Sequence, residues 1–439
     1  MPHAPFHLAW FLEGSSVHGW NHPWSGAIGR DWQKPDLFID LARSLERACF
    51  DYVLIEDSSY VGESFEGKRD IYLERGISVP RQDPSVVATL LANATSRIGI
   101  VPTFGTFAYP PFLLARLVST LDQVSGGRIG WNMVTGSSDF AARNFGLSGM
   151  PEHDLRYEMA EEYMSVVNRL WDSWDADAVV ADLRSGRLVD PAKVRSVDFD
   201  GRWYKSRGPL NSGPAPQGRP VIAQAGGSPR GRQFAAGHAD TIVAMSQGFE
   251  GMRAYRDDVR ARMRALGRDP DQCKVLFLIS PILGASDAEA EAEERRRNEQ
   301  AAADVSSALA FFGKITNIDF GGYDLDTPVS RLDLHTNGHQ QSLDEFRRFA
   351  GDRSLRQAMA AFSQGGKSLR LVGGPERIAD EMATAMEAVG GDGFLISLPA
   401  ITRRAMAEIA DGLVPALQAR GLARREYRHA QFRDNLLDF

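Results

Sequence analysis

The residues that could do chemistry gather in two neighbouring stretches of the first half of the sequence. Residues 128–136 form an apolar segment, typical of a buried strand, that ends in the polar residues Asn132 and Thr135. Further on, His153 and Tyr157 stand four residues apart at the opening of a long amphipathic helix. Because residues at positions i and i+4 share a helix face, the imidazole and the phenol are predicted to point together at a ligand above the end of the strand.

A second motif, Gly-Gly-Ser-Pro at residues 226–229, follows the predicted strand 220–225. The two glycines let the backbone approach a ligand, Ser228 can cap a helix, and Pro229 suits its first position. The free N–H groups of such a helix start could hold a phosphate. The same residues also begin helices that bind nothing, so the motif by itself is compatible with a purely structural role.

Two further features stand where a ligand could bind. Asp57 follows the predicted strand 52–56. An acidic residue at the carboxyl end of such a strand lies where α/β proteins bind ligands. A helix cap or a surface carboxylate explains this residue equally well. Four of the eight tryptophans fall within the first 32 residues. Trp20 and Trp24 stand in a loop rich in Gly, Pro, Asn and Ser, so they either form an aromatic wall for an apolar substrate or plug the mouth of the fold.

The elements that must position these residues alternate along the chain. Strand-like segments occur at residues 7–12, 52–56, 98–103, 128–134, 220–225, 240–244, 275–283 and 393–397. Eight strand-then-helix alternations with no dividing linker predict an α/β fold, a (β/α)8 TIM barrel. We expect one domain over residues 1–439, with loop insertions at about 58–82, 176–219 and 300–365.

Composition and charge exclude several classes of partner. The net charge is −7 and the basic residues are scattered, which favours neither nucleic acid nor an anionic membrane. The N-terminus lacks the features of a signal peptide, and no apolar stretch is long enough to span a bilayer, so we expect a cytoplasmic protein. Cys49 and Cys273 are too few for a disulfide framework, and His335 and His339 lack an acidic third ligand, so no metal site is predicted.

Taken together, the motifs resemble those of the bacterial luciferase-like flavin monooxygenases, in the branch that contains the nitrilotriacetate, pristinamycin IIA synthase and dibenzothiophene-sulfone monooxygenases. The resemblance covers nearly the whole chain. It rests on an ordered set of segments, at residues 50–57, 109–112, 121–135, 142–146, 153–157, 224–232, 318–325, 392–394 and 433–437.

This resemblance implies a TIM barrel that binds FMN at the carboxyl ends of its strands. The residues that match the family's flavin contacts are Asp57, Thr103, Asn132, His153, Tyr157, Gly227 and Ser228. Ser228 and the N–H groups after Gly227, joined by His153 and Tyr157, would hold the phosphate, which agrees with the helix start described above. Asn132 and Thr103 would meet the isoalloxazine region.

The resemblance also implies the oxygenase half of a two-component system. A separate NAD(P)H:flavin reductase would supply FMNH2, and O2 would be the co-substrate; consistently, the chain has no Gly-x-Gly-x-x-Gly dinucleotide motif. Reduced flavin would react with O2 to a C4a or N5 flavin peroxide, which carries the difficult chemistry while the protein excludes water. The predicted function is oxidation of a small apolar, aromatic or heterocyclic compound by a homodimer or homotetramer, with residues 427–439 as an arm on a partner subunit.

Some residues of the chain depart from the family's pattern. Gly105 and Gly136 stand where the family commonly has serine, so two hydroxyls expected near the flavin are missing, and Ser137 or Thr106 are candidates to replace them. In the tryptophan loop, which is not general to the branch, His18 is the candidate for proton transfer because an imidazole titrates near neutrality. A loop histidine bonded to a neighbour is the more common case, so this role for His18 is the weaker of the two interpretations.

Two other functions are compatible with the same barrel. One is a deazaflavin-dependent dehydrogenase that moves hydride without O2. The other is a flavin-binding protein without turnover. The missing hydroxyls at Gly105 and Gly136 are compatible with this function, whereas the long insertions with aromatic residues argue against it.

Overall fold

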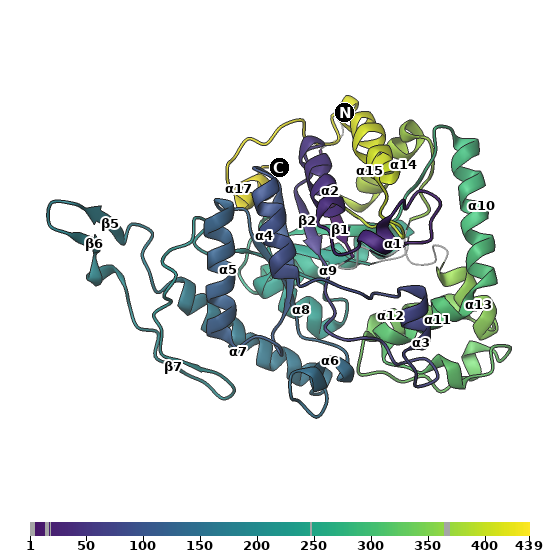
Figure 1. The fold of residues 1–439 in the computed structure, drawn as a ribbon, viewed down its shortest axis with the longest axis horizontal. Helices are drawn as coiled ribbons and strands as arrows, with labels where there is room; N and C mark the ends of the chain where they lie inside the picture. Colours follow the sequence, from purple (N-terminus) through teal and green to yellow (C-terminus); the bar gives the residue numbers. More distant parts are fainter. Residues whose placement is uncertain (1–4, 14–16, 18, 246–247, 364–368) are drawn as a thin grey trace.

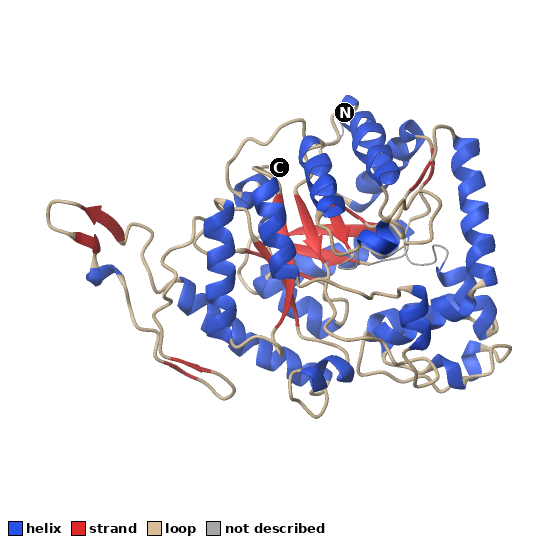
Figure 2. Cartoon of the chain, viewed as in Figure 1, coloured by secondary structure: helices blue, strands red, loops and turns tan. Residues whose placement is uncertain are grey.

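Eight parallel strands close into a barrel in the computed structural model, which describes residues 5–13, 17, 19–245, 248–363 and 369–439 (Figure 1). Around the barrel the strands follow the order β1-β14-β11-β10-β9-β4-β3-β2. Their bounds are β1 His7–Leu12, β2 Tyr52–Ile55, β3 Gly99–Gly105, β4 Gly130–Val134, β9 Val221–Gln224, β10 Thr241–Ala244, β11 Lys274–Ile279 and β14 Gly393–Ile396. The predicted (β/α)8 barrel is confirmed, with helices surrounding the strands (Figure 2).

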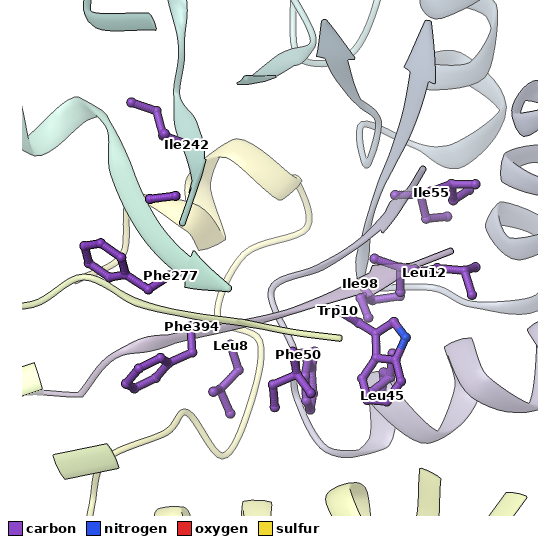
Figure 3. Close-up of a cluster of buried hydrophobic side chains, with 14 of the residues drawn as sticks. Leu8, Trp10, Leu12, Leu45, Phe50, Ile55, Ile98, Ile242, Phe277 and Phe394 are labelled. Carbon is purple, nitrogen blue, oxygen red and sulfur yellow. The ribbon is translucent and has the colours of Figure 1, made fainter. Parts of the chain in front are cut away.

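The apolar residues of each strand divide between two cores because successive side chains point to opposite faces. On β1, Trp10 belongs to the layer between strands and helices, whereas Ala9 lies in the barrel interior. Figure 3 shows Trp10 beside Leu45 and Phe50, and the rings of Trp10 and Phe50 meet edge to face at 6.4 Å. Burial on both faces explains why these strands are almost wholly apolar in sequence.

The helices that cover the barrel begin and end at recognisable capping residues. Asp83 accepts a hydrogen bond from the N–H of Ser85 at the start of α4, and Gly126 ends α5 with a φ of 70°. Among the described residues, no helix is both long and apolar enough to cross a membrane. The covering helices are α2 Asp36–Arg47, α4 Pro84–Ala94, α5 Pro111–Ser125, α7 His153–Trp171, α8 Pro229–His238, α9 Gly248–Ala265, α14 Pro375–Val389, α15 Arg403–Ala407, a π-helix Glu408–Leu413 and α16 Val414–Ala419.

The three segments expected as insertions fold in different ways. Residues 58–82 include a short helix, α3 Asp70–Arg75. Residues 176–219 form two hairpins that project from the body (Figure 1). The bounds of the hairpin strands are β5 Val179–Asp182, β6 Arg187–Val189, β7 Phe199–Asp200 and β8 Lys205–Ser206. Shorter elements elsewhere are α1 Ile28–Asp31, α6 Asp139–Asn144 and the 3-10 turns Pro191–Lys193, Pro270–Gln272, Phe320–Gly322 and Val329–Arg331.

The segment 300–365 is mostly helical and builds a lobe beside the barrel mouth (Figure 1). Its helices are α11 Val305–Thr316, α12 Gln340–Ala350 and α13 Leu355–Ser363, which follow the long α10 Asp287–Ala303. The lobe has an apolar core of its own, in which Phe312 packs against Phe320, Phe346 and Phe362. Nearby, β12 Ile282–Leu283 pairs with β13 Val372–Gly373 outside the barrel.

The C-terminal tail closes the amino end of its own barrel. Phe432, in the short helix α17 Phe432–Leu436, is 1% exposed and packs inside the barrel, where a Cβ on Gly99 would lie 2.6 Å from its ring. Arg433 pairs with Asp240 at 2.8 Å. The expectation that the tail is an arm on a partner subunit is therefore wrong, because these residues complete the core of the same chain.

Candidate active site

The residues predicted to bind flavin lie on four strands that are neighbours in the barrel. Asp57 follows β2, Thr103 lies in β3, Asn132 in β4, and Ser228 follows β9. The register pairs Thr103 directly with Asn132. Since the strands are parallel, their carboxyl ends share one rim of the barrel, and the structure gathers these residues on one arc of that rim.

Thr103 and Asn132 form the polar centre of this arc. Both side chains are buried, and the Asn132 Nδ2–H donates to Thr103 Oγ1 at 2.8 Å. The Asn132 Oδ1 atom is buried and has no hydrogen-bond partner among the described residues. Leaving a buried carbonyl oxygen unpaired costs about 1–3 kcal/mol, so this atom fits the acceptor for a donor on a bound ring.

The start of α8 offers an anion site. Ser228 caps the helix, because its Oγ accepts from the Gly231 N–H at 3.0 Å, and Pro229 occupies the first turn as predicted. His153 Nε2 lies 3.3 Å from Ser228 Oγ, and its Nδ1 lies 2.7 Å from the Asp154 carboxylate. The helix N-terminus, a hydroxyl and an imidazole thus converge, an arrangement suited to phosphate.

Tyr157 completes this cradle from the next turn of α7. Its ring packs edge-on to His153 at 5.2 Å, and burial raises the pKa of its phenol while a hydrogen bond with Gln224 lowers it. A Cβ on Gly231 would lie 2.7 Å from the phenol oxygen, so only glycine lets the phenol reach the first turn of α8. The imidazole and the phenol thus lie side by side on one face of α7, as their spacing predicted, and their shared ligand stays a prediction.

The position of Gly227 shows that the lobe reaches the cradle. A Cβ there would lie 1.1 Å from Oε1 of Gln341, a residue of α12. The Gln341 side-chain amide donates to the Met245 carbonyl at 2.9 Å and to the Glu345 carboxylate at 2.7 Å. Helix α12 therefore lies directly against the glycine-rich turn, and the absence of a side chain at Gly227 makes this contact possible.

Gln224 is a site residue that sequence reasoning did not assign. It ends β9, its Oε1 is buried without a hydrogen-bond partner among the described residues, and a Cβ on Gly226 would lie 2.5 Å from that atom. Like Asn132, it presents an acceptor at the strand ends. The available signal was a polar residue at the end of an apolar strand, directly before the two glycines.

Acidic and basic groups cluster where β2 ends. Glu56 and Arg81 form an ion pair, and Arg81 Nη1 also donates to the Glu56 carbonyl at 3.2 Å. Burial raises the pKa of the neighbouring Asp57 carboxyl to about 6, although the positive charge of Arg81 opposes the shift. Asp57 is thereby able to gain and lose a proton near neutral pH.

Aromatic packing explains the two glycines that depart from the family's pattern. A Cβ on Gly105 would lie 2.5 Å from the ring of Phe107, and a Cβ on Gly136 would lie 2.8 Å from the same ring and 2.4 Å from Met150 Cε. Phe107 in turn packs edge-on to Phe145 at 5.5 Å. The space beside both glycines is filled by apolar side chains in place of the expected hydroxyls.

The tryptophans near the N-terminus lie in two different environments, the core and the exposed loop. Trp10 is core, whereas Trp20 is 42% exposed and its Nε1–H donates to the Arg75 carbonyl at 3.2 Å. Trp24 is 59% exposed and lies 5.0 Å from the guanidinium of Arg404, at the start of α15. His18, the predicted proton-transfer residue, lies outside the described residues.

Nothing in the described part of the chain groups three or more metal-binding side chains. The exposed His335 pairs with Asp333 at 2.7 Å. Of the two cysteines, Cys273 is buried in the core and Cys49 follows α2 with a φ of 62°.

The fold and the site together define a class of protein. A parallel (β/α)8 barrel carries its ligand site at the carboxyl ends of its strands. Here that rim combines a phosphate-type cradle at Ser228 with the unpaired buried acceptors of Asn132 and Gln224. This combination fits a barrel enzyme whose ligand has both an anionic group and a polar ring system.

Comparison with known proteins identifies the family. The model of the family described as luciferase-like monooxygenase matches residues 15–393. The chain is 38% identical over 441 residues to the dibenzothiophene-sulfone monooxygenase of Rhodococcus erythropolis (strain XP), covering 98% of this chain and 96% of that protein. It is 31% identical over 441 residues to nitrilotriacetate monooxygenase component A of Aminobacter aminovorans, covering 98% and 95%. The chain belongs to the luciferase-like monooxygenase family and is a flavin-dependent monooxygenase, as its motifs predicted.

A solved structure supports the same assignment. Riboflavin lyase, crystallised with modified FMN and its substrate riboflavin, superimposes with a TM-score of 0.89 at 31% identity, covering 99% of this chain and 96% of that one. Enzymes of the family use reduced flavin and O2. The relatives therefore favour oxygenation over the deazaflavin-dependent dehydrogenase and the binding protein without turnover.

Proposed function

We propose that this chain is the oxygenase component of a two-component system, which binds FMNH2 and inserts one oxygen atom from O2 into a small apolar, aromatic or heterocyclic compound. The observation that carries the proposal is the convergence of the Ser228 hydroxyl and the His153 imidazole on the N-terminus of α8. That cradle lies on the same rim as the Thr103 and Asn132 pair. A phosphate and a ring system on one cofactor would occupy both.

In this proposal each side chain of the arc has a defined task. Ser228, His153 and Tyr157 hold the phosphate, and the turn at Gly227 lets the backbone approach it. The unpaired oxygen of Asn132 accepts a hydrogen bond from the ring, with Thr103 fixing the amide from its other side. The bound flavin supplies the activation of O2.

The remaining groups of the barrel mouth act on protons, water and substrate. Asp57, whose pKa is raised to about 6 by burial, exchanges a proton close to the ring. Trp20 and Trp24 form the aromatic wall for the substrate, and His18, which lies outside the described residues, transfers a proton. Helices α11 and α12 of the lobe exclude water from the reacting atoms.

A separate NAD(P)H:flavin reductase would supply FMNH2, since the related nitrilotriacetate enzyme is by name one component of a larger system. The proposal places the protein in the cytoplasm, where NAD(P)H is available, as a homodimer or homotetramer of one-domain subunits. Support for self-association comes from the β5–β6 hairpin, where Leu183 is 97% and Leu188 66% exposed. Exposed apolar residues on a projecting hairpin are typical of interfaces between subunits.

Stopped-flow spectroscopy tests the proposal directly. Protein loaded anaerobically with FMNH2 is mixed with oxygenated buffer, and the transient absorbance of an oxygenated flavin is followed against free FMNH2 as the control. We expect this absorbance only with the protein present. If it never forms, or if a deazaflavin binds more tightly than FMN in a parallel titration, the proposed function is refuted.

A further inference from the structure

Helix α11 of the lobe places a lysine over the end of β2 that has no role in the cofactor site described above. Lys314 is only 4% exposed. Its ammonium donates to the Ser58 hydroxyl at 2.9 Å and lies 5.3 Å from the centre of the Tyr60 ring. Ser58 directly follows Asp57, so a buried cation stands on the rim of the barrel where ligands bind.

The position of this cation is fixed before any ligand arrives. The Tyr60 hydroxyl donates to the backbone carbonyl of Lys314 at 2.9 Å, while its ring faces the ammonium of the same residue. The Tyr60 ring itself stacks on Phe140 of α6, at 6.1 Å and an interplanar angle of 18°. Lys314 is therefore held from both ends by a side chain that is fixed in turn, which is the preorganisation expected of a binding residue.

The Lys314 ammonium lies in a mixed charge environment, in which the carboxylates of Glu56, Glu13 and Asp57 raise its pKa and Arg81 lowers it. Burial lowers its pKa to about 8, against the opposing charge of Glu56, so it remains protonated at neutral pH. Glu56 is engaged by Arg81. Among the described residues, the ammonium contacts a neutral hydroxyl and an aromatic face, which together account for two of its three N–H groups.

Arg81 supplies a second, independent donor in the same cluster. Its Nη2 is buried and has no hydrogen-bond partner among the described residues. Its positive charge acts on both Lys314 and Asp57, so the two cations are close enough to interact. A buried N–H group without a hydrogen-bond partner destabilises the folded protein, so an acceptor on a bound ligand would offset the cost at Arg81 Nη2.

We propose that Lys314, assisted by Arg81, binds an acidic group of the substrate, such as a carboxylate, a sulfinate or a sulfonate. The substrate would then be an aromatic or heterocyclic acid whose apolar body lies toward the tryptophan loop. This inference rests on the proposed function and makes it more specific. It assigns Lys314 to substrate selection, separate from the residues that hold the cofactor.

Matched acid and amide probes test the assignment. Biphenyl-2-carboxylate and biphenyl-2-carboxamide have nearly the same shape, as do the smaller benzoate and benzamide. Their dissociation constants are measured by calorimetry with the FMN-loaded protein at about pH 7. A charge-assisted hydrogen bond predicts that the acid of at least one pair binds about 10-fold more tightly than its amide.

Three variants locate the effect. In Lys314→Met the acid should bind no better than the amide, while the amide and FMN bind as in the native protein. Lys314→Arg should keep part of the preference for the acid. Lys68→Met is the matched control, because Lys68 lies in the segment 58–82 but is 62% exposed and pairs with Glu66, so the preference should be unchanged.

The outcomes separate an anchor from a structural lysine. In urea unfolding, Lys314→Met should be as stable as the native protein or more stable, because an apolar side chain replaces a buried ammonium. A clear loss of stability together with weaker FMN binding would instead assign Lys314 a structural role. The inference is also overturned if neither acid binds, or if Lys314→Met keeps the preference for the acid. Failure of oxygenated flavin to form in the native protein would refute the proposed function, whatever the probes show.

Discussion

Removing the Ser228 hydroxyl is the most informative perturbation of the cofactor cradle. Its Oγ accepts from the Gly231 N–H at 3.0 Å and lies 3.3 Å from His153 Nε2, so it both caps α8 and faces the anion site. Loss of a helix cap on mutation to alanine costs about 1 kcal/mol of stability. Loss of a charge-assisted hydrogen bond to a phosphate costs about 1.5–3 kcal/mol, or roughly 10- to 100-fold in the dissociation constant.

Two substitutions separate these effects. The backbone of Ser228, with φ −69° and ψ 159°, is accessible to both alanine and glycine without strain. Glycine is a far better cap than alanine, so Ser228→Gly should lose only a few tenths of a kcal/mol of stability, whereas Ser228→Ala should lose about 1 kcal/mol. Both variants should lose the same affinity for FMN.

Flavin fluorescence titration with FMN and with riboflavin measures the affinity, and urea unfolding measures the stability. Riboflavin lacks the phosphate, so its affinity should be the same for the native protein and both variants. If Ser228→Gly binds FMN as tightly as the native protein, the phosphate does not lie at Ser228. If riboflavin binding falls as much as FMN binding, the variants have disturbed the ring site and the assignment of the cradle fails.

Three further predictions address charge and packing. Asp57→Asn should raise the free energy of unfolding by about 2 kcal/mol at about pH 8 and change it little at about pH 4, as measured by urea unfolding. The reason is that burial raises the folded-state pKa of Asp57 to about 6, above the usual value near 4. The contribution of the Asp57 carboxyl to stability is therefore present at low pH and is lost as the pH rises through about 6. An equal effect at both pH values would contradict this. Phe432→Ala should lower the free energy of unfolding by about 3 kcal/mol and leave the affinity for FMN unchanged, because the ring fills the opposite end of the barrel. The control Leu437→Ala removes a side chain that is 38% exposed and should lower the free energy of unfolding by less than about 0.5 kcal/mol. Similar losses of stability for the two variants in thermal unfolding would show that the tail does not pack in the core. Gly105→Ala should lower the free energy of unfolding by about 2 kcal/mol in the native protein, since its Cβ would lie 2.5 Å from the Phe107 ring. The loss of stability should be clearly smaller when Phe107→Ala is already present. If the two losses simply add in a double-mutant cycle, the clash is excluded.

The barrel was predictable because local pattern and tertiary structure agree along its strands. Each strand is buried on both faces, and such segments stand out as short apolar runs between turn residues. Among the predicted strands, 275–283 runs furthest past its observed end, because β11 ends in the barrel at Ile279 and the chain resumes outside it as β12. Pro281 lies between the two parts, and its missing N–H cannot take part in a ladder of parallel strands.

The cradle was partly predictable for a related reason. His153 and Tyr157 share a helix face by their spacing, and Ser228 with Pro229 marks a helix start, so each half is a local feature. What sequence spacing did not show is that the two helix ends meet, with His153 3.3 Å from Ser228. That contact depends on the order of strands in the barrel, and it was expected only from the resemblance to the family.

The substrate side of the mouth was far less predictable, and the reason is physical. Lys314 and Gln341 lie in the segment 300–365, where nothing in the local sequence indicates that a side chain reaches the barrel. Their positions at the barrel mouth follow from contacts with residues far away in the chain, Ser58 and Met245. Similarly, Trp10 lies in a strand with its ring toward the helices. It is therefore separated from the loop tryptophans, although they are its neighbours in sequence.

This difference suggests how the site divides its tasks. The cradle is built from strand ends and helix starts, whose geometry the barrel itself fixes, whereas the groups over β2 depend on how α11 packs against the segment 58–82. Tyr60 is the link, because it bonds the backbone of Lys314 and stacks on Phe140 beside the end of β4. If Lys314 faces the substrate as proposed, substitutions in α11 can change that charge while the candidate phosphate cradle, which the lobe contacts through Gln341 of α12, stays as it is. A single barrel could in this way keep one cofactor while its insertions select among substrates.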